Sequence, residues 1–134
     1  MWKEFLSSIG FGSAKVETVI AKEVYKPGDT IKGVVKIHGG NTEQTINKIT
    51  LSLYTSLEET RDDSDFSFID EECRHVELGN IGTIHPGEQR SIPIQIPLSA
   101  NHPITKGNLK TFLRTSLGIP QAVNTTSEDE IIIS

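Results

Sequence analysis

The sequence predicts an all-β fold, an antiparallel β-sandwich of about seven strands with a short N-terminal amphipathic helix. Turn-forming clusters of Pro, Gly and Asn divide the 134 residues into short segments and leave no room for long helices. Between these turns, hydrophobic and polar residues alternate with period two, as in strands that have one buried and one solvated face. Parallel α/β folds are disfavoured because their crossovers need a dozen or more residues, usually helical, between strands.

One apolar stripe at the start of the chain predicts the helix. It consists of Trp2, Phe5, Leu6 and Ile9, which fall at positions i, i+3, i+4 and i+7. Gly10 and Gly12 end the pattern, so residues 1–12 form an N-terminal amphipathic segment and residues 13–134 the sandwich domain. The stripe either caps the sandwich or docks on a partner. A membrane is disfavoured because the polar face has no basic rim.

Alternating or strand-like segments give the candidate strands, which are residues 15–24, 31–37, 49–57, 66–78, 92–98, 109–117 and 129–133. In the third of them, Ile49, Leu51, Leu53 and Leu57 are expected to face the core, with Thr50, Ser52 and Ser56 facing water. Pro93 cannot donate a hydrogen bond to a neighbouring strand. The strand 92–98 is therefore expected at a sheet edge, at a strand start or at a bulge, and a sheet edge is a place where another chain can add.

Two Pro-Gly turns resemble each other. Lys26-Pro-Gly-Asp29 precedes the strand that starts at Ile31, and His85-Pro-Gly-Glu88 precedes the strand that starts at Ile92. Proline presets φ at the first central position, and glycine accepts the positive φ at the second. Both are predicted to be type II turns that join two strands.

Composition narrows the range of functions. There are 13 Lys and Arg against 18 Asp and Glu, a net charge of −5, which provides no basic footprint for nucleic acid or an anionic membrane. A single cysteine, Cys73, cannot form an internal disulfide. No apolar run approaches the roughly 20 residues that span a bilayer, and the first ten residues lack the apolar stretch of a secretory signal. A cytoplasmic location is therefore expected.

The sequence does not contain the familiar motifs of catalysis or metal binding. The four histidines, at positions 38, 75, 85 and 102, lie in separate segments without metal-ligand spacing, so neither a metal nor a cofactor is expected. His85 and His102 stand beside prolines in turns, where a solvated position is expected. Cys73 is interpreted as a small strand residue because its acidic neighbours disfavour the thiolate. The chain is not expected to be an enzyme.

The strongest charge feature is the acidic segment from Glu58 to Glu77, with nine acids against two arginines. It is interpreted as a solvated hairpin tip, as a docking surface for a basic partner, or as a calcium site, although the spacing of a calcium loop is absent. The candidate partner-binding residues are Glu58, Glu59, Asp62, Asp63, Asp65, Asp70, Glu71 and Glu72.

Several segments taken together resemble the bacterial sporulation-control protein M family. They are residues 12–20, 25–40, 46–53, 84–88, 92–98, 113–118, 122–123 and 128–133, in this order and spacing. The resemblance covers nearly the whole chain. Members of the family resemble arrestins, with two β-sandwich domains in tandem, and the resemblance implies that this chain corresponds to the first, arrestin-like domain. The chain departs from the family at Asn124-Thr125, where Asp-Pro is usual.

The resemblance implies a non-enzymatic cytoplasmic regulator of sporulation, or of a related stress or cell-division programme, that acts through protein contacts. It supplies no ligand residues. The alternative is a calcium- or lipid-binding β-sandwich module. The expected partners are proteins, including a second copy joined through an edge strand or through the face that a second domain would cover.

Overall fold

The computed structural model describes residues 13–60, 66–120 and 124–134, with Thr60 and Phe66 described by their backbone only. The predicted N-terminal helix, with Trp2, Phe5, Leu6 and Ile9, lies outside the described residues. So do three acids of the acidic segment, Asp62, Asp63 and Asp65.

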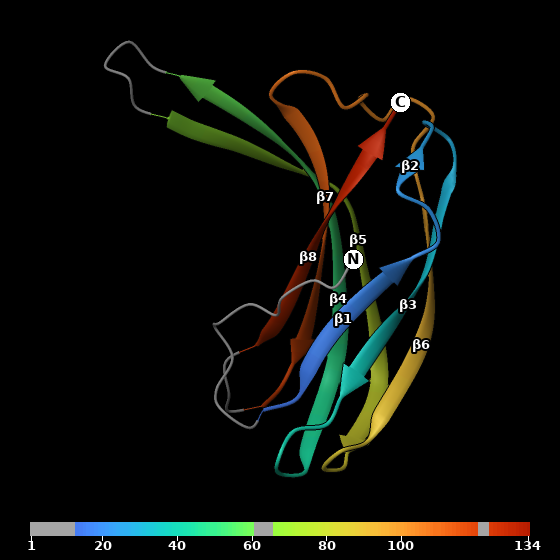
Figure 1. Ribbon diagram of the computed structural model, residues 1–134, viewed down its shortest axis with the longest axis vertical. Helices are drawn as coiled ribbons and strands as arrows, with labels where there is room; N and C mark the ends of the chain where they lie inside the picture. The colour runs from blue at the N-terminus through green and yellow to red at the C-terminus, as the bar shows by residue number, and fades with distance from the viewer. Residues whose placement is uncertain (1–12, 61–65, 121–123) are drawn as a thin grey trace.

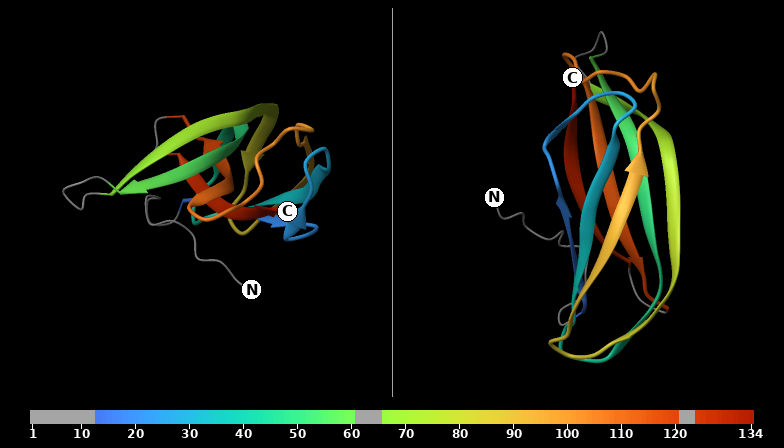
Figure 2. Two further views of the ribbon diagram at one scale, coloured as in Figure 1. Left: turned by 90° about the horizontal axis from the view of Figure 1, so that it is seen from above. Right: turned by 90° about the vertical axis from the view of Figure 1, so that its right-hand side faces the viewer.

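Two β-sheets pack face to face, as predicted for a sandwich (Figures 1 and 2). The strands are β1 (Lys15–Ile20), β2 (Val24–Tyr25), β3 (Thr30–His38), β4 (Gln44–Thr60), β5 (Phe66–Ile84), β6 (Gln89–Pro97), β7 (Leu109–Gly118) and β8 (Thr125–Ile133). One sheet has the order β1-β3-β6 and the other the order β2-β8-β7-β4-β5. All neighbouring strands are antiparallel except β2 and β8, which are parallel. The all-β fold class is confirmed.

The alternation predicted for β4 is found over most of its length. Ile49, Leu51 and Leu53 are buried in the core between the sheets, whereas Thr50, Ser52 and Ser56 are only partly covered. Leu57 is half-buried. The β4–β5 register shifts between Leu53 and Tyr54, so a bulge interrupts the simple period of two on the β5 side.

Both Pro-Gly turns have the predicted type II geometry. Gly28 has φ +92° and Gly87 has φ +74°. The backbone N–H of Asp29 donates to the carbonyl of Lys26 at 3.0 Å, and that of Glu88 donates to the carbonyl of His85 at 3.0 Å. In each turn the acidic side chain also accepts a hydrogen bond, 2.9 Å long, from the backbone N–H of the first turn residue.

The two turns lie at opposite ends of the β3–β6 pair. The N–H of Leu98, after β6, donates to the carbonyl of Asp29, and the N–H of Gly39, after β3, donates to the carbonyl of Glu88, both at 2.7 Å. A Cβ at Gly39 would lie 2.1 Å from the carbonyl oxygen of His85, so only glycine allows this close approach. β6 is an edge strand, as Pro93 predicts.

Hydroxyl groups connect the sheets where β1 lies beside β7 and β8. The hydroxyl of Thr18 is 2.7 Å from that of Thr115 and 3.4 Å from that of Ser127, and all three side chains are buried. The hydroxyl of Thr125 donates to the carbonyl of Ala14 at 3.1 Å. These contacts satisfy polar groups that would otherwise be costly to bury.

Two strand boundaries differ from the prediction. The segment 15–24 was expected to be one strand, but it contributes β1 to one sheet and the start of β2 to the other. The chain crosses between sheets here, and the backbone N–H of Lys22 donates to the hydroxyl of Tyr25 in the bend. The last strand begins at Thr125 rather than Asp129, because buried Thr125 and Ser127 take core-facing positions that hydrophobic residues usually occupy.

The β4–β5 hairpin extends beyond the rest of its sheet. β7 pairs with β4 only as far as Leu57, whereas β4 and β5 continue to pair as far as Thr60 and Phe66. This extension, residues 58–60 and 66–68, is called the hairpin arm below. It projects away from the two sheets at the upper left of Figure 1 and on the left of Figure 2.

Candidate functional site

Five of the eight acidic residues predicted to bind a partner are described, and all of them lie on the β4–β5 hairpin. Glu58 and Glu59 are on β4, at the start of the hairpin arm. Asp70, Glu71 and Glu72 are on β5 and are exposed. Because Glu58 pairs with Phe68, two residues from Asp70, the hairpin brings the two acidic groups close together. They form one acidic surface at the end of the sheet.

Loop residue Asn108 holds the base of the hairpin arm. The backbone N–H of Glu58 donates to the carbonyl of Asn108 at 3.1 Å, and the Asn108 side-chain amide donates back to the carbonyl of Glu58. These two hydrogen bonds fix the position at which β4 leaves β7. The hairpin arm therefore starts from an anchored point.

Closer to the sandwich, the acids of β5 are paired. Glu72 accepts a hydrogen bond from the hydroxyl of Ser52 at 2.6 Å and lies 3.3 Å from Nδ1 of His75. Glu77 lies 3.1 Å from Nε2 of the same histidine and 3.2 Å from Nζ of Lys48. These contacts lower the pKa of both carboxyl groups, that of Glu72 chiefly through Ser52 and that of Glu77 chiefly through His75. They raise the pKa of His75.

A cluster of aromatic and charged residues occupies the outer face of the same sheet. The rings of Tyr54 and Phe112 stack with centroids 5.6 Å apart, and the guanidinium of Arg114 lies 4.8 Å above the Tyr54 ring. Glu128 accepts hydrogen bonds from the Tyr54 hydroxyl and from Nε of Arg114, the latter at 3.0 Å. Burial, together with the hydrogen bond to Glu128, raises the pKa of Tyr54.

Next to this cluster is a groove of about 240 Å³ between the base of the hairpin arm and β7. Its apolar lining comes from Tyr54, Phe68 and Phe112, and Glu58 and Lys110 are among its charged lining residues. Phe68 is 66% exposed. Phe68 lies in a segment that was predicted as a strand but not as part of a site. An aromatic residue inside an acidic segment is the signal that could have identified it as a site residue.

The histidines differ in their surroundings. The prediction that His102 is solvated is wrong, because its side chain is buried and Nε2 lies 3.0 Å from the hydroxyl of Thr111. His85 is exposed, as predicted, and Nδ1 lies 2.9 Å from Glu43. Cys73 lies on β5, as predicted, and partial desolvation is the main cause of its raised thiol pKa.

Among the residues that the structure describes, no group of three or more His, Cys, Asp or Glu side chains is placed to hold a metal ion. In the same part of the chain, no helix is long and apolar enough to cross a membrane.

The fold and this surface define a two-sheet β-sandwich domain with an acidic hairpin at one end. Residues 2–134 match the model of the family described as SpoOM protein, and the chain belongs to this family. It is 31% identical over 132 residues to the sporulation-control protein spo0M of Bacillus subtilis (strain 168), which covers 98% of this chain. It resembles the crystal structure of Spo0M from the same organism with a TM-score of 0.83 and 30% identity over 92% of this chain. The chain spans about half the length of these relatives, 51% and 50%.

Proposed function

We propose that this domain is the partner-binding part of a non-enzymatic, cytoplasmic regulator of sporulation, and that its acidic hairpin contacts a basic surface of a protein partner. Membership of the SpoOM protein family and the name of the Bacillus subtilis relative support the role in sporulation control. The acidic hairpin supports the mode of action.

The main evidence for this binding surface is that β4 and β5 extend past the last residue of β4 that pairs with β7. A hairpin that serves only to cover the core has no need to extend beyond it. Glu59 on the hairpin arm and Asp70 just below it are exposed. Clustered carboxylates in this position raise the association rate with a basic surface through long-range attraction.

The proposal is tested by site-specific photo-cross-linking in cells of the organism whose genome encodes this chain. A photoreactive residue at Glu59 is expected to yield a cross-linked species that the same residue at Lys36 does not. Lys36 is exposed on β3, in the other sheet, and is the matched control. The variant Glu58→Gln/Glu59→Gln is expected to bind the cross-linked partner more slowly and with a weaker salt dependence. Equal cross-linking at both positions, or an unchanged rate and salt dependence, would contradict the proposal.

A further inference from the structure

β5 is the last strand in its sheet, so among the described strands none pairs with the second side of its backbone. The other sheet edges are less suited to pairing. β6 carries Pro93 and Pro97, which have no backbone donor, and β2 has only two residues. β1 lies beside β8, where the hydroxyls of Thr18 and Ser127 connect the sheets. A long exposed edge such as β5 is a template on which another strand can pair.

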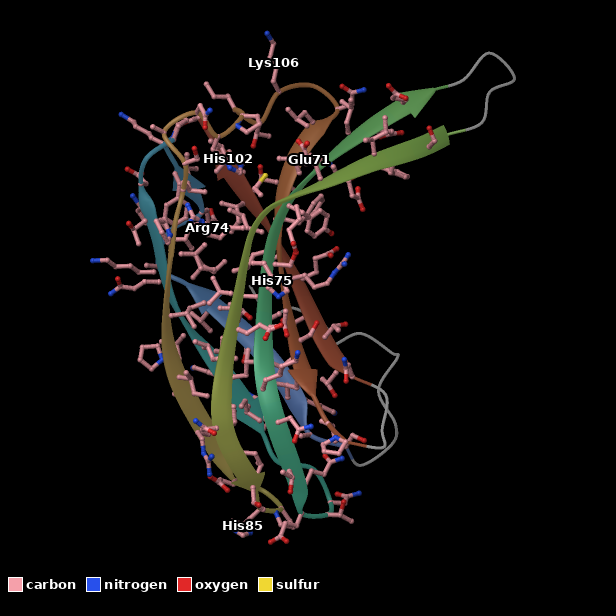
Figure 3. The ribbon with its side chains drawn as sticks, turned by 180° about the vertical axis from the view of Figure 1, so that it is seen from behind. Glu71, Arg74, His75, His85, His102 and Lys106 are labelled. Carbon is pink, nitrogen blue, oxygen red and sulfur yellow. The ribbon has the colours of Figure 1, made fainter. Side chains whose placement is uncertain are left out.

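The middle of this edge carries both signs of charge. Asp70, Glu71 and Glu72 are followed, after Cys73, by a basic pair, Arg74 and His75. Figure 3 shows Glu71, Arg74 and His75 along β5. All of these residues are exposed. Because an antiparallel copy runs in the opposite direction, the acidic stretch of one β5 can lie opposite the basic pair of the other.

The pairing with β4 assigns each side chain to a face of the sheet. Glu71 and Arg74 lie opposite Thr55 and Leu53, which are buried, so they share the inner face. Asp70 and His75 lie opposite Ser56 and Ser52 and share the outer face. Cys73 is the extra residue at the register shift, which explains why residues three positions apart share a face.

The assignment of side chains to the two faces favours one register for the pairing of two β5 strands. When Glu71 of one copy is opposite Arg74 of the second copy, Asp70 is opposite His75 and Ile69 is opposite Val76. Each pair then joins residues on the same face. Sliding the strands by two residues in one direction places Glu71 opposite Glu72, which lie on different faces. Sliding them in the other direction pairs Glu72 with His75, but it places Asp70 opposite Glu77 and leaves Arg74 opposite Cys73, without an acidic partner.

The geometry points to a homodimer in which two copies pair antiparallel through residues 69–76 of β5, so that their five-stranded sheets form one continuous sheet around a twofold axis. Because of the twofold symmetry, each acid–base pair occurs twice in the dimer. This register also places Ile69, which is 51% exposed, beside the partly buried Val76 of the second copy. The inference goes beyond the proposed function. Asp70, Glu71 and Glu72 belong to the same acidic surface, whereas Glu58 and Glu59, the residues changed to test the proposed function, lie on β4.

Charge reversal tests the inference. Glu71→Arg and Arg74→Glu each place like charges opposite each other at both repeats of the pair. By sedimentation of the whole chain, each variant alone is expected to have a dimer dissociation constant at least about tenfold higher than that of the wild type. An equimolar mixture of the two variants is expected to form a heterodimer as strong as the wild-type dimer, because both repeats then regain opposite charges. Raising the salt concentration is expected to weaken the wild-type dimer.

Glu59→Arg is the matched control, because it changes the net charge by the same amount on the same hairpin and is not on β5. It is expected to dimerise like the wild type. Recovery in the mixture also shows that both variants are folded. A wild-type chain that sediments as a monomer throughout the micromolar range would overturn the inference. So would a dimer that both reversals leave intact, or a mixture that remains monomeric.

Discussion

Burial controls the chemistry of His102. Its side chain is 5% exposed, and its Nε2 is hydrogen-bonded to Thr111 on the neighbouring strand β7. A neutral ring can accept the hydroxyl proton of Thr111 and needs no solvation, whereas a charged ring would lose water that the fold does not replace. Desolvation therefore lowers the pKa of His102. The exposed His75 has the opposite shift, because Glu77 and Glu72 stabilise its charged form.

Acid is expected to destabilise the fold through His102. Because its pKa is lower in the folded than in the unfolded chain, the unfolded state binds the proton first as the pH falls below about 6.5. The contribution of His102 to stability is complete above that pH and is lost as the pH falls through the folded pKa. Urea unfolding at about pH 7.5 and 5.5 should show a smaller loss of stability in His102→Gln than in the wild type.

His75→Gln is the comparison for this experiment. The raised pKa of His75 means that its contribution is complete below the unfolded pKa and is lost as the pH rises through the folded value. Its removal should therefore make the acid-induced loss larger, not smaller. A His102→Gln variant that loses as much stability in acid as the wild type would show that His102 titrates alike in both states.

The first Pro-Gly turn supplies a prediction about the backbone. Gly28 has φ +92°, a region that β-branched residues avoid, while a Cβ there would make only an ordinary van der Waals contact, 4.0 Å from the Cα of Ala100. Gly28→Val is therefore expected to destabilise the fold by about 1–3 kcal/mol through backbone strain alone. Thermal unfolding of both proteins measures the difference. An unchanged melting temperature would mean that the turn relaxes without cost.

At the scale of the strands, the alternation of hydrophobic and polar residues predicted the strands that have a hydrophobic face. It missed strand segments that have no such face. β3, β4 and β6 were located because Ile, Leu and Val recur at almost every second position, and β7 because buried Leu113 and Leu117 alternate with buried threonines. The start of β8 was missed because the buried positions at Thr125 and Ser127 are filled by hydroxyl residues. The length of β5 was underestimated because its C-terminal part, which includes Gly79 and Gly82, has a turn-like sequence but continues to pair with β4 across a register shift. The role of β5 as a sheet edge depends on strand order, which local patterns do not encode.

The core-facing side of β4 can be tested by two neighbouring substitutions. Leu51 is buried, so Leu51→Ala should destabilise the protein by about 2–5 kcal/mol through lost burial and a cavity. Ser52 faces outward and donates only one exposed hydrogen bond, to Glu72, so Ser52→Ala should cost less than about 0.5 kcal/mol. Denaturant unfolding measures both. Similar losses at the two positions would mean that the side chains of β4 face the other way.

Across the whole molecule, charge is concentrated in one region. The acidic segment from Glu58 to Glu77 has nine acids and two arginines, a net charge of −7, and the other residues have eleven bases and nine acids, or +2, which together give −5. The core lies between the two sheets, whereas much of this charge lies on or next to the hairpin arm. The sequence therefore predicted which segment carries the charge, and the strand pairing shows that the hairpin arm within this segment extends beyond the core.

This separation predicts that partner binding and folding can be altered independently. Asp62, Asp63 and Asp65 add three negative charges to an already acidic segment, and such charges repel one another over about 8 Å at physiological salt. Replacing all three with Asn removes this repulsion, so the melting temperature should stay the same or rise slightly. Stopped-flow mixing with the basic partner should show slower association and a weaker salt dependence, with a smaller effect on dissociation. A triple variant that unfolds would make these carboxylates structural. One that binds with an unchanged rate and salt slope would limit recognition to the acids of β4 and β5.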